Sequence, residues 1–402
     1  MTAASQDEVR RNNLALVLRH LHFDGPVSRS ELVAYTGLNR STVGDLVTEL
    51  ADEGLVVEQP GASGSVGRPS LVVAPRAESA VTLAFDFRVE RVVGAIVGIG
   101  GEIIARVDAP NTRTDVDPQA AIEQLLDMSH ELLDAVPDDA LWVGTGVGVP
   151  GIVDASNGMV KQAPNLNWID VPLGEMLARG FREVFGDVPA TFIGNDADLG
   201  AWAEHIRGAG AAVRNVIYIS GEVGVGGGVV LNGQLMSGAG GFGGEIGHMV
   251  VQPDGLPCRC GSRGCWETVI GRNAVIHCLP GNTDATDIAQ VIDALHAGNP
   301  RVRAGMHEVG NWLGIGLGNL VNIFNPDVIV LGGHLSALLP ELKDEIDAMV
   351  GRSIRAAREQ VHIVVPALGR DSTLVGAAES AFAPLLERPI EALRQSSTLV
   401  AL

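Results

Sequence analysis

Two apolar stripes with helical spacing dominate the first fifty residues. Between them, Ser28 and Glu31 have the spacing of a capping box that opens a short helix. Gly37 suits the left-handed residue that ends this helix, and Asn39 is placed to cap the next one. The stripes themselves predict two further helices, and they consist of Leu14, Val17, Leu18 and Leu21, and of Val43, Leu46, Val47 and Leu50.

Two strand-like runs, 55–58 and 71–74, follow and enclose a segment rich in glycine, proline and serine. This order of elements is that of a winged helix-turn-helix and predicts a DNA-binding domain over residues 1–76. Arg40, Ser41 and Thr42 open the third helix, the end that enters the major groove. Arg68 lies in the wing, where it can reach phosphate or a narrow minor groove. The alternative is a three-helix bundle that contacts protein.

Beyond Pro75, strand patterns alternate with helical ones. A strand, a glycine-rich turn and a second strand occur from Val81 and again from Val216, which indicates two related lobes. We therefore predict an α/β fold with its site at the strand ends, where loops converge. The first lobe spans 80–194 and is completed by a C-terminal helix at 380–402. The second spans 195–379 and carries the oligomer contacts.

The distribution of charged residues limits which part of the chain can bind nucleic acid. The 402 residues carry 28 basic and 48 acidic side chains, a net charge of −20, which argues against a surface that coats nucleic acid or anionic membrane. Residues 1–76 hold seven arginines and nine acids, a net of −2, so −18 lies on the rest of the chain. We expect a soluble cytoplasmic protein, because the chain has no secretory pattern and no uncharged apolar run of roughly 20 residues.

Three of the four cysteines lie within eight residues, at Cys258, Cys260 and Cys265. Cys-x-Cys spacing is too short for an easy mutual disulfide and favours a bound metal. With His248 they form a Cys₃His donor set, which is typical of structural zinc. The alternative is a group of buried free thiols. Cys278 has no such neighbours and is predicted to be a core residue.

Four motifs together carry a specific resemblance. Over about residues 80–380 the chain resembles the ROK family of repressors, open reading frames and sugar kinases. With its DNA-binding domain it is similar to the repressor branch, which has xylose- and N-acetylglucosamine-responsive members. The resemblance implies a two-lobed actin-like, sugar-kinase (ribonuclease H-like) fold. The motifs are NDAD at 195–198, GGEIGH at 243–248, CRCGSRGCWE at 258–267 and NPDVIVLGG at 325–333.

The resemblance also implies the roles of particular residues. It places zinc on His248 and the three clustered cysteines, and it puts Asp196 at the position of the general base of the kinases. Sugar hydroxyls both donate and accept hydrogen bonds, so carboxylates and amides suit them. The implied sugar-binding residues are Asn195, Asp196, Glu245, His248 and Glu267, with Gly151 and Asn165 lining the same pocket.

Both loops that hold ATP phosphates in kinases of the family are altered. Residues 86–90 read DFRVE, so Arg88, Val89 and Glu90 replace a Gly-Gly-Thr run, and residues 220–224 read SGEVG. Bulky and acidic residues cannot cradle phosphate as glycine backbone does. We therefore predict no enzyme activity, with Asp196 only accepting a hydrogen bond. Arg88 is expected to form a salt bridge with Glu90 or Glu222, the alternative being that it binds a sugar phosphate.

These features predict a sugar-responsive transcriptional regulator, a repressor of carbohydrate uptake or catabolism genes that a monosaccharide or its derivative releases from operator DNA. Paired heads need a spacing of about 34–36 Å, so a homodimer or homotetramer is expected. One alternative is an ATP-dependent sugar kinase that carries a DNA-binding domain. Another is a regulator whose sugar or sugar phosphate acts as a corepressor.

Overall fold

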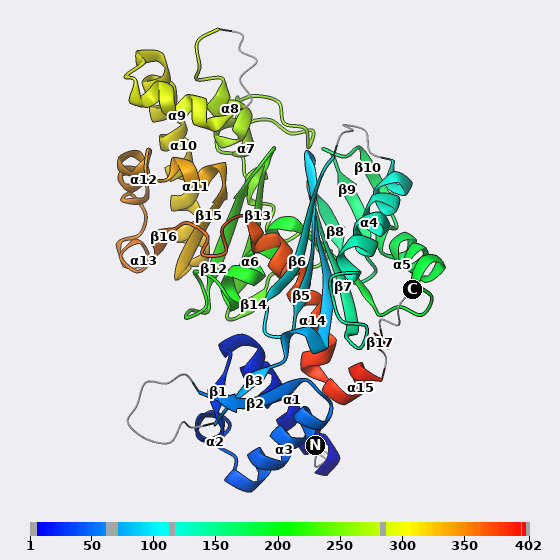
Figure 1. The fold of residues 1–402 in the computed structure, drawn as a ribbon. Coiled ribbons are helices and arrows are strands. Elements are labelled where there is room, and N and C mark those ends of the chain that lie inside the picture. The colour runs from blue at the N-terminus through cyan, green and yellow to red at the C-terminus, as the bar shows by residue number, and fades with distance from the viewer. Residues whose placement is uncertain (1–5, 62–70, 112–116, 282–286, 395, 399–402) are drawn as a thin grey trace.

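The structure is a computed structural model that describes residues 6–61, 71–111, 117–281, 287–394 and 396–398. Figure 1 shows a small N-terminal part below two larger parts, each built around its own sheet. Among the described residues, no helix combines the length and the apolar character needed to cross a membrane.

The N-terminal part, residues 6–75, is called the head below. Its three helices and the strands β2 and β3 have the predicted order, and a further strand β1, which was not predicted, makes a sheet with the order β1-β3-β2. The Ser28–Glu31 capping box is present, Gly37 ends its helix with φ of 68°, and Asn39 caps the next helix. Both predicted apolar stripes are buried. The elements are α1 (Gln6–Asp24), β1 (Val27–Ser28), α2 (Arg29–Thr36), α3 (Arg40–Asp52), β2 (Val56–Pro60) and β3 (Leu71–Pro75).

The first lobe is built on a sheet with the strand order β11-β7-β4-β5-β6, and β17 pairs with β7. Side chains of β4 alternate between two cores, as the strand period requires. Val81, Leu83 and Phe85 pack with α4 and α5, whereas Ala80 and Ala84 pack with α14. The elements are β4 (Ala80–Phe87), β5 (Arg91–Gly98), β6 (Ile103–Pro110), α4 (Pro118–Leu133), β7 (Leu141–Val149), α5 (Leu173–Phe185), β11 (Thr191–Asn195), α14 (Ser372–Glu387), α15 (Pro389–Leu393) and β17 (Ser397–Thr398).

A small antiparallel sheet, β10-β9-β8, adjoins this lobe after β7. Its strands are β8 (Ile152–Asp154), β9 (Met159–Ala163) and β10 (Trp168–Val171). The helix that covers the first sheet late in the chain, α14, begins at Ser372, so the predicted boundary at residue 380 falls inside it.

The second lobe is built on a sheet with the order β16-β15-β12-β13-β14. Its helix α10 packs on one face and α6 on the other, and Cys278 is a buried core residue there, as predicted. The elements are α6 (Asp196–Ile206), β12 (Val216–Gly221), β13 (Val225–Leu231), β14 (Gln234–Leu235), α7 (Glu267–Ile270), α8 (Arg272–Ile276), α9 (Ile288–His296), α10 (Pro300–Phe324), β15 (Val328–Gly333), α11 (His334–Leu338), α12 (Lys343–Val350), α13 (Arg355–Arg358) and β16 (His362–Val364).

The two sheets have one topology. In each, a three-strand antiparallel meander is followed by two strands parallel to its first strand, so β4-β5-β6-β7-β11 corresponds to β12-β13-β14-β15-β16. The strand patterns that restart at Val81 and Val216 begin these two units. The prediction of two related lobes is therefore confirmed.

Helices α6 and α14 lie side by side between the two sheets (Figure 1). Helix α14 contacts β4 and β7, and α6 contacts β12 and β13. Glycine allows this close packing: a Cβ on Gly376 would lie 2.0 Å from the backbone oxygen of Leu199, and one on Gly146 would lie 1.9 Å from that of Ala377. This helix pair connects the two lobes directly.

Candidate functional site

A cleft of about 1180 Å³ lies between the lobes and brings together every residue that the sequence assigned to sugar binding. Parallel pairing of β11 with β7 places the strand ends, and the loops after them, at the same edge of the sheet. The loops of the second lobe face them. The cleft is lined by Gly151, Asn165, Asn195, Asp196, Glu245, His248 and Glu267, and also by Cys258 and Cys260.

Asn195 and Asp196 stand where β11 ends and α6 begins. The Asn195 side-chain oxygen accepts bonds from the backbone N–H of Ala197 (2.8 Å) and Asp198 (3.0 Å), and its amide donates to the Gly151 carbonyl (2.7 Å). Asp196 Oδ1 accepts from the same Ala197 N–H (2.9 Å). Burial, reinforced by the Asp86 carboxylate nearby, raises the pKa of Asp196 to about 7. The cap fixes both side chains at the cleft, and Asp196 exchanges its proton near neutral pH.

Arg88 lies on the first altered loop and reaches across to the second. Its Nε donates to Asp86 Oδ2 (2.6 Å), its Nη1 pairs with Glu222 (3.2 Å), and its Nη2 donates to the carbonyl of Arg370 (2.8 Å). The predicted salt bridge is thus present with Glu222, while Glu90 pairs with Arg272 instead (2.7 Å). A guanidinium already neutralises the buried Asp86 carboxylate.

Glu245, His248 and Glu267 form the second-lobe wall of the cleft. His248 Nε2 lies 3.8 Å from a Glu245 oxygen, and its Nδ1 lies 3.7 Å from Glu267 Oε1 and 3.6 Å from Cys258 Sγ. Gly247 permits this turn, because a Cβ there would lie 1.9 Å from the Val225 carbonyl oxygen. The two ring nitrogens of His248 therefore face different groups, one the cysteine loop and the other Glu245.

The predicted metal ligands converge. The nearest ligand atoms of His248, Cys258, Cys260 and Cys265 all lie within 4.8 Å of one another. Cys260 Sγ is 3.7 Å from Cys265 Sγ, close to the edge of about 3.8 Å in a tetrahedron of Zn–S bonds about 2.3 Å long. The residues present fit a zinc ion in both donor chemistry and spacing.

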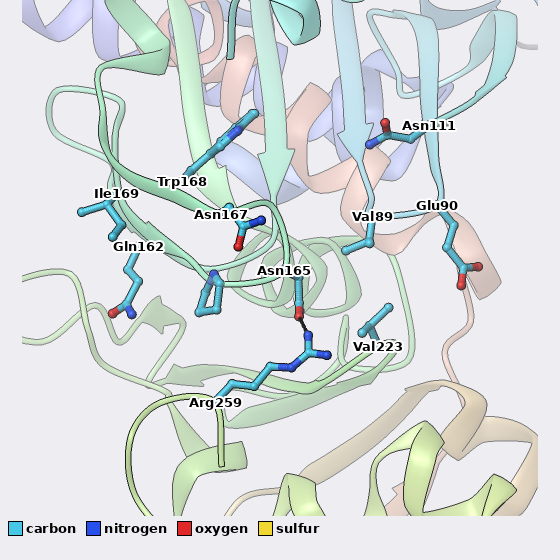
Figure 2. Close-up of a pocket in the computed structure, with 11 residues that line it drawn as sticks. Val89, Glu90, Asn111, Gln162, Asn165, Asn167, Trp168, Ile169, Val223 and Arg259 are labelled. Carbon is cyan, nitrogen blue, oxygen red and sulfur yellow. Dashed lines mark hydrogen bonds between the residues drawn. The ribbon is translucent and has the colours of Figure 1, made fainter. Parts of the chain in front are cut away.

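The cleft continues into a second cavity of about 900 Å³ (Figure 2). Arg259, on the cysteine loop, donates to the side-chain oxygen of Asn165 (2.7 Å), and Val89 and Val223 lie close by from the two lobes. Sequence reasoning missed Arg259 and Arg272, which join the lobes. Neither arginine could be paired with its partner from the sequence, because Asn165 and Glu90 lie far from Arg259 and Arg272 along the chain.

In the head, the predicted DNA-contacting residues that are described stand at the start of α3. Arg40 and Ser41 are exposed and Thr42 is half-buried. The hydroxyl of Ser41 and the backbone N–H of Thr42 both donate to the side-chain oxygen of the Asn39 cap, at 2.7 and 2.9 Å. Arg68 lies outside the described residues.

Comparison with known proteins adds three findings. The ROK family profile matches residues 82–383. A xylose repressor from Bacillus spizizenii is 31% identical over 384 residues, covering 93% of this chain and 98% of the relative. A glucokinase from Streptomyces coelicolor is 30% identical over 330 residues, covering 76% of this chain and 98% of the relative.

Solved structures agree with this fold. A ROK family transcriptional regulator, described as a homologue of the E. coli MLC protein, superposes with a TM-score of 0.78 at 24% identity, covering 96% of this chain and 99% of the other. A ROK family glucokinase from Streptomyces griseus, in complex with glucose and AMPPNP, gives 0.63 at 26% identity and covers 75% of this chain and 99% of the other. The match to the regulator covers enough of this chain to extend over both the head and the lobes. The match to the kinase leaves about a quarter of this chain uncovered.

Proposed function

Because the chain belongs to the ROK family, we propose that it is a sugar-responsive transcriptional repressor that leaves its operator when a monosaccharide enters the cleft. The observation that carries the proposal is the extent of the similarity to the xylose repressor, 93% of this chain, which includes the head. The match to the glucokinase covers 76%. D-Xylose is the first effector to test.

We propose that the sugar is held by Asn195, Asp196, Glu245, His248 and Glu267, with Gly151 and Asn165 at its side. All seven residues line one cleft and come from both lobes. A sugar that bonds to both walls favours one placement of the lobes, and this differential affinity is what an effector needs to shift a conformational equilibrium.

For the metal, we propose a structural zinc ion on His248, Cys258, Cys260 and Cys265. Zinc supplies a rigid cross-link without redox chemistry. His248 would bind it through Nδ1, the nitrogen 3.6 Å from Cys258 Sγ, and so keep Nε2 on the side of Glu245 for a sugar hydroxyl. The cross-link ties the loop of Glu245 to the cysteine loop.

We propose further that the chain has no kinase activity. Arg88 occupies the first phosphate loop and is bonded to Asp86 and Glu222, where a kinase needs open glycine backbone. An ATP-dependent sugar kinase is the alternative that the related glucokinases favour. ATP-dependent phosphorylation of D-xylose or D-glucose that Asp196→Asn abolishes would establish that alternative.

DNA contact is assigned to a domain of residues 1–76, through Arg40, Ser41 and Thr42 in the major groove and Arg68 in the wing. The acidic lobes repel phosphate, so affinity depends on pairing the heads of a homodimer or homotetramer in the cytoplasm. A sugar acting as corepressor is the alternative regulation.

The test starts from the wild-type protein and a random DNA library. Fragments selected by the protein are titrated with and without D-xylose, alongside a panel of monosaccharides and sugar phosphates. We expect sequence-specific binding that xylose or another panel sugar weakens. A repressor is contradicted if no sequence is enriched, and induction is contradicted if sugars only tighten binding.

A further inference from the structure

We propose that His22, Arg207 and Glu379 form a three-way junction through which the sugar cleft controls the position of the head. This inference rests on the proposed function and specifies its regulation. Each residue comes from a different part of the molecule. His22 lies on α1 of the head, Glu379 lies on α14 against the first sheet, and Arg207 directly follows α6 on the second lobe.

The Glu379 carboxylate is the centre of the junction. Its Oε2 lies 2.8 Å from His22 Nε2, and its Oε1 accepts from Arg207 Nε at 2.5 Å. The side chains of His22 and Glu379 are 0% and 1% exposed, and that of Arg207 is 13% exposed. A buried carboxylate that loses a partner is costly, so the three groups hold one another in place.

Further bonds fix the orientation of each partner. The Gly100 N–H donates to His22 Nδ1 (2.9 Å), so the proton of the neutral ring is on Nε2, where it donates to Glu379. Arg207 also donates to the carbonyls of Gly100 (3.2 Å) and His22 (3.1 Å), and its guanidinium carbon lies 5.1 Å from the Phe23 ring centre. One guanidinium therefore binds the head, the first lobe and Glu379 at once.

Helix α6, which Arg207 directly follows, and helix α14, which carries Glu379, both begin at the cleft. Helix α6 starts at Asp196 and has 11 residues, so it spans about 16 Å from the cleft to the junction. Thr373, in the first turn of α14, donates to the Asp196 carbonyl (3.0 Å), and Glu379 lies further along this helix. The cleft thus lies where both helices begin, and the junction lies further along the pair, at the end of α6 and the middle of α14.

This geometry gives the coupling a mechanical route. Helix α6 packs on the second sheet and α14 on the first, so a change in the angle between the lobes slides one helix along the other. The sliding moves Arg207 relative to Glu379 and Gly100. Because hydrogen bonds weaken steeply with angle and distance, a small displacement is enough to change how His22 and the head are held.

The test uses the full-length protein, a DNA fragment selected by the wild-type protein, and D-xylose as the probe. Arg207→Lys keeps the charge but cannot donate in the planar fork that joins three acceptors. We expect the xylose-induced change in DNA affinity, about 5- to 150-fold in a coupled protein, to fall toward 1 in this variant. Xylose binding by the DNA-free variant should stay unchanged. Arg214→Lys is the matched control, because among the described residues the Arg214 side chain donates only to the Asn232 carbonyl on the same lobe.

Each outcome of this experiment either supports or overturns the proposed junction. If Arg207→Lys keeps the wild-type fold-change, the junction is overturned and the repressor function stands. If xylose leaves the wild-type affinity unchanged, the panel sugar that weakens it most replaces xylose as the probe, and if no panel sugar changes it, the induction and the junction fall together. Should Arg207→Lys not fold, Glu379→Gln is judged by the same criterion. Hydrogen exchange on the wild type decides independently: xylose must alter protection of the Gly100 amide, and unaltered protection overturns the proposal.

Discussion

The first lobe contacts the rest of the chain in two different ways. Against the head, Glu379 of the first lobe forms a buried group with His22 of the head and Arg207 of the second lobe, and this group is nearly closed to water. Against the second lobe, across the cleft, it uses more open pairs. These are Arg88 with Glu222, Glu90 with Arg272, and Asn165 with Arg259, in which Glu222 is 46% and Glu90 67% exposed.

Burial determines what these contacts can do. Exposed ion pairs contribute about 0–1 kcal/mol each, so the cleft can exchange them for a ligand at little cost. Removal of one partner from a buried pair costs about 3–5 kcal/mol, so the junction holds as a unit or rearranges as a unit. Helix α6 thus has a contact that can adjust at one end and a contact that forms or breaks as a whole at the other. This arrangement suits a protein in which ligand binding switches the head between two positions.

The largest effect is expected from Glu379→Ala, which leaves His22 and Arg207 without their common partner. We expect the free energy of unfolding to fall by about 3–5 kcal/mol, measured from urea denaturation followed by circular dichroism. Ser380→Ala on the same helix is the control, because within the described part of the chain that hydroxyl bonds only to the Gly376 carbonyl of its own helix. An unchanged denaturation midpoint in Glu379→Ala would remove the distinction between the two contacts.

The next effect concerns the cleft side and zinc. Cys260→Ala removes an exposed ligand of the proposed zinc site, so the His248 loop should lose the proposed cross-link. We expect zinc affinity to fall by at least about 10- to 100-fold, the cost of losing even an outer partner of a metal ligand, and D-xylose affinity to fall with it because His248 is no longer held. Titration calorimetry checks this, with zinc content measured by emission spectrometry. Cys278→Ala, a core thiol, should keep its zinc, and full zinc content in Cys260→Ala contradicts the ligand assignment.

Sequence alone predicted the features that rest on neighbouring residues. The capping box at Ser28, the left-handed Gly37 and the strand alternation from Val81 act within a few positions, so they are readable before folding. The residues that line the cleft were proposed from the resemblance to the ROK family, whose motifs match short continuous stretches such as Asn195 and Asp196. The prediction that the two lobes are related followed from the strand pattern that occurs twice in the sequence.

The junction was missed because its partners are far apart in the sequence. His22 and Glu379 are separated by 357 positions, and Arg207 and Glu379 by 172. One signal was available: Glu379 is the lone charged residue among apolar and small ones until the last turn of its helix, STLVGAAESAFAPLLE. A charge in such a run predicts a buried partner without naming it. The Arg88 bridge was predictable, but choosing Glu222 over Glu90 needed tertiary placement.

The pH dependence of stability offers a smaller, graded test. Burial lowers the pKa of His22 below its usual 6.5, so the ring contributes full stability above that pH. As the pH falls from 6.5 toward the native pKa, the unfolded chain takes up a proton first and stability is lost, by up to about 1.4 kcal/mol per pH unit. Burial acts to raise the pKa of Glu379, but the hydrogen bonds from His22 and Arg207 and the charge of Arg207 outweigh it, so this pKa is also lowered and the contribution of Glu379 is lost only below its usual 4.5.

His22→Gln isolates the histidine contribution. The variant should lose less stability than the wild type between pH 6.5 and 5, as measured by melting temperature in buffers of constant ionic strength. His307→Gln is the control, since this exposed ring pairs with Glu345 on the surface. Melting curves of His22→Gln that run parallel to the wild type across this range would contradict a buried neutral His22.

The smallest effect is expected from Glu90→Gln at the mouth of the cleft. Glu90 is 67% exposed and bonds to Arg272 at 2.7 Å, so the change should alter the free energy of unfolding by about 1 kcal/mol or less. Salt should reduce the difference further, because exposed charges are screened within about 10 Å at 0.1 M. Urea denaturation at low and high salt, run beside Glu379→Gln, compares one amide replacement in the two environments. If Glu90→Gln lowers the free energy of unfolding as much as Glu379→Gln does, burial does not determine the difference in strength between the two contacts of the first lobe.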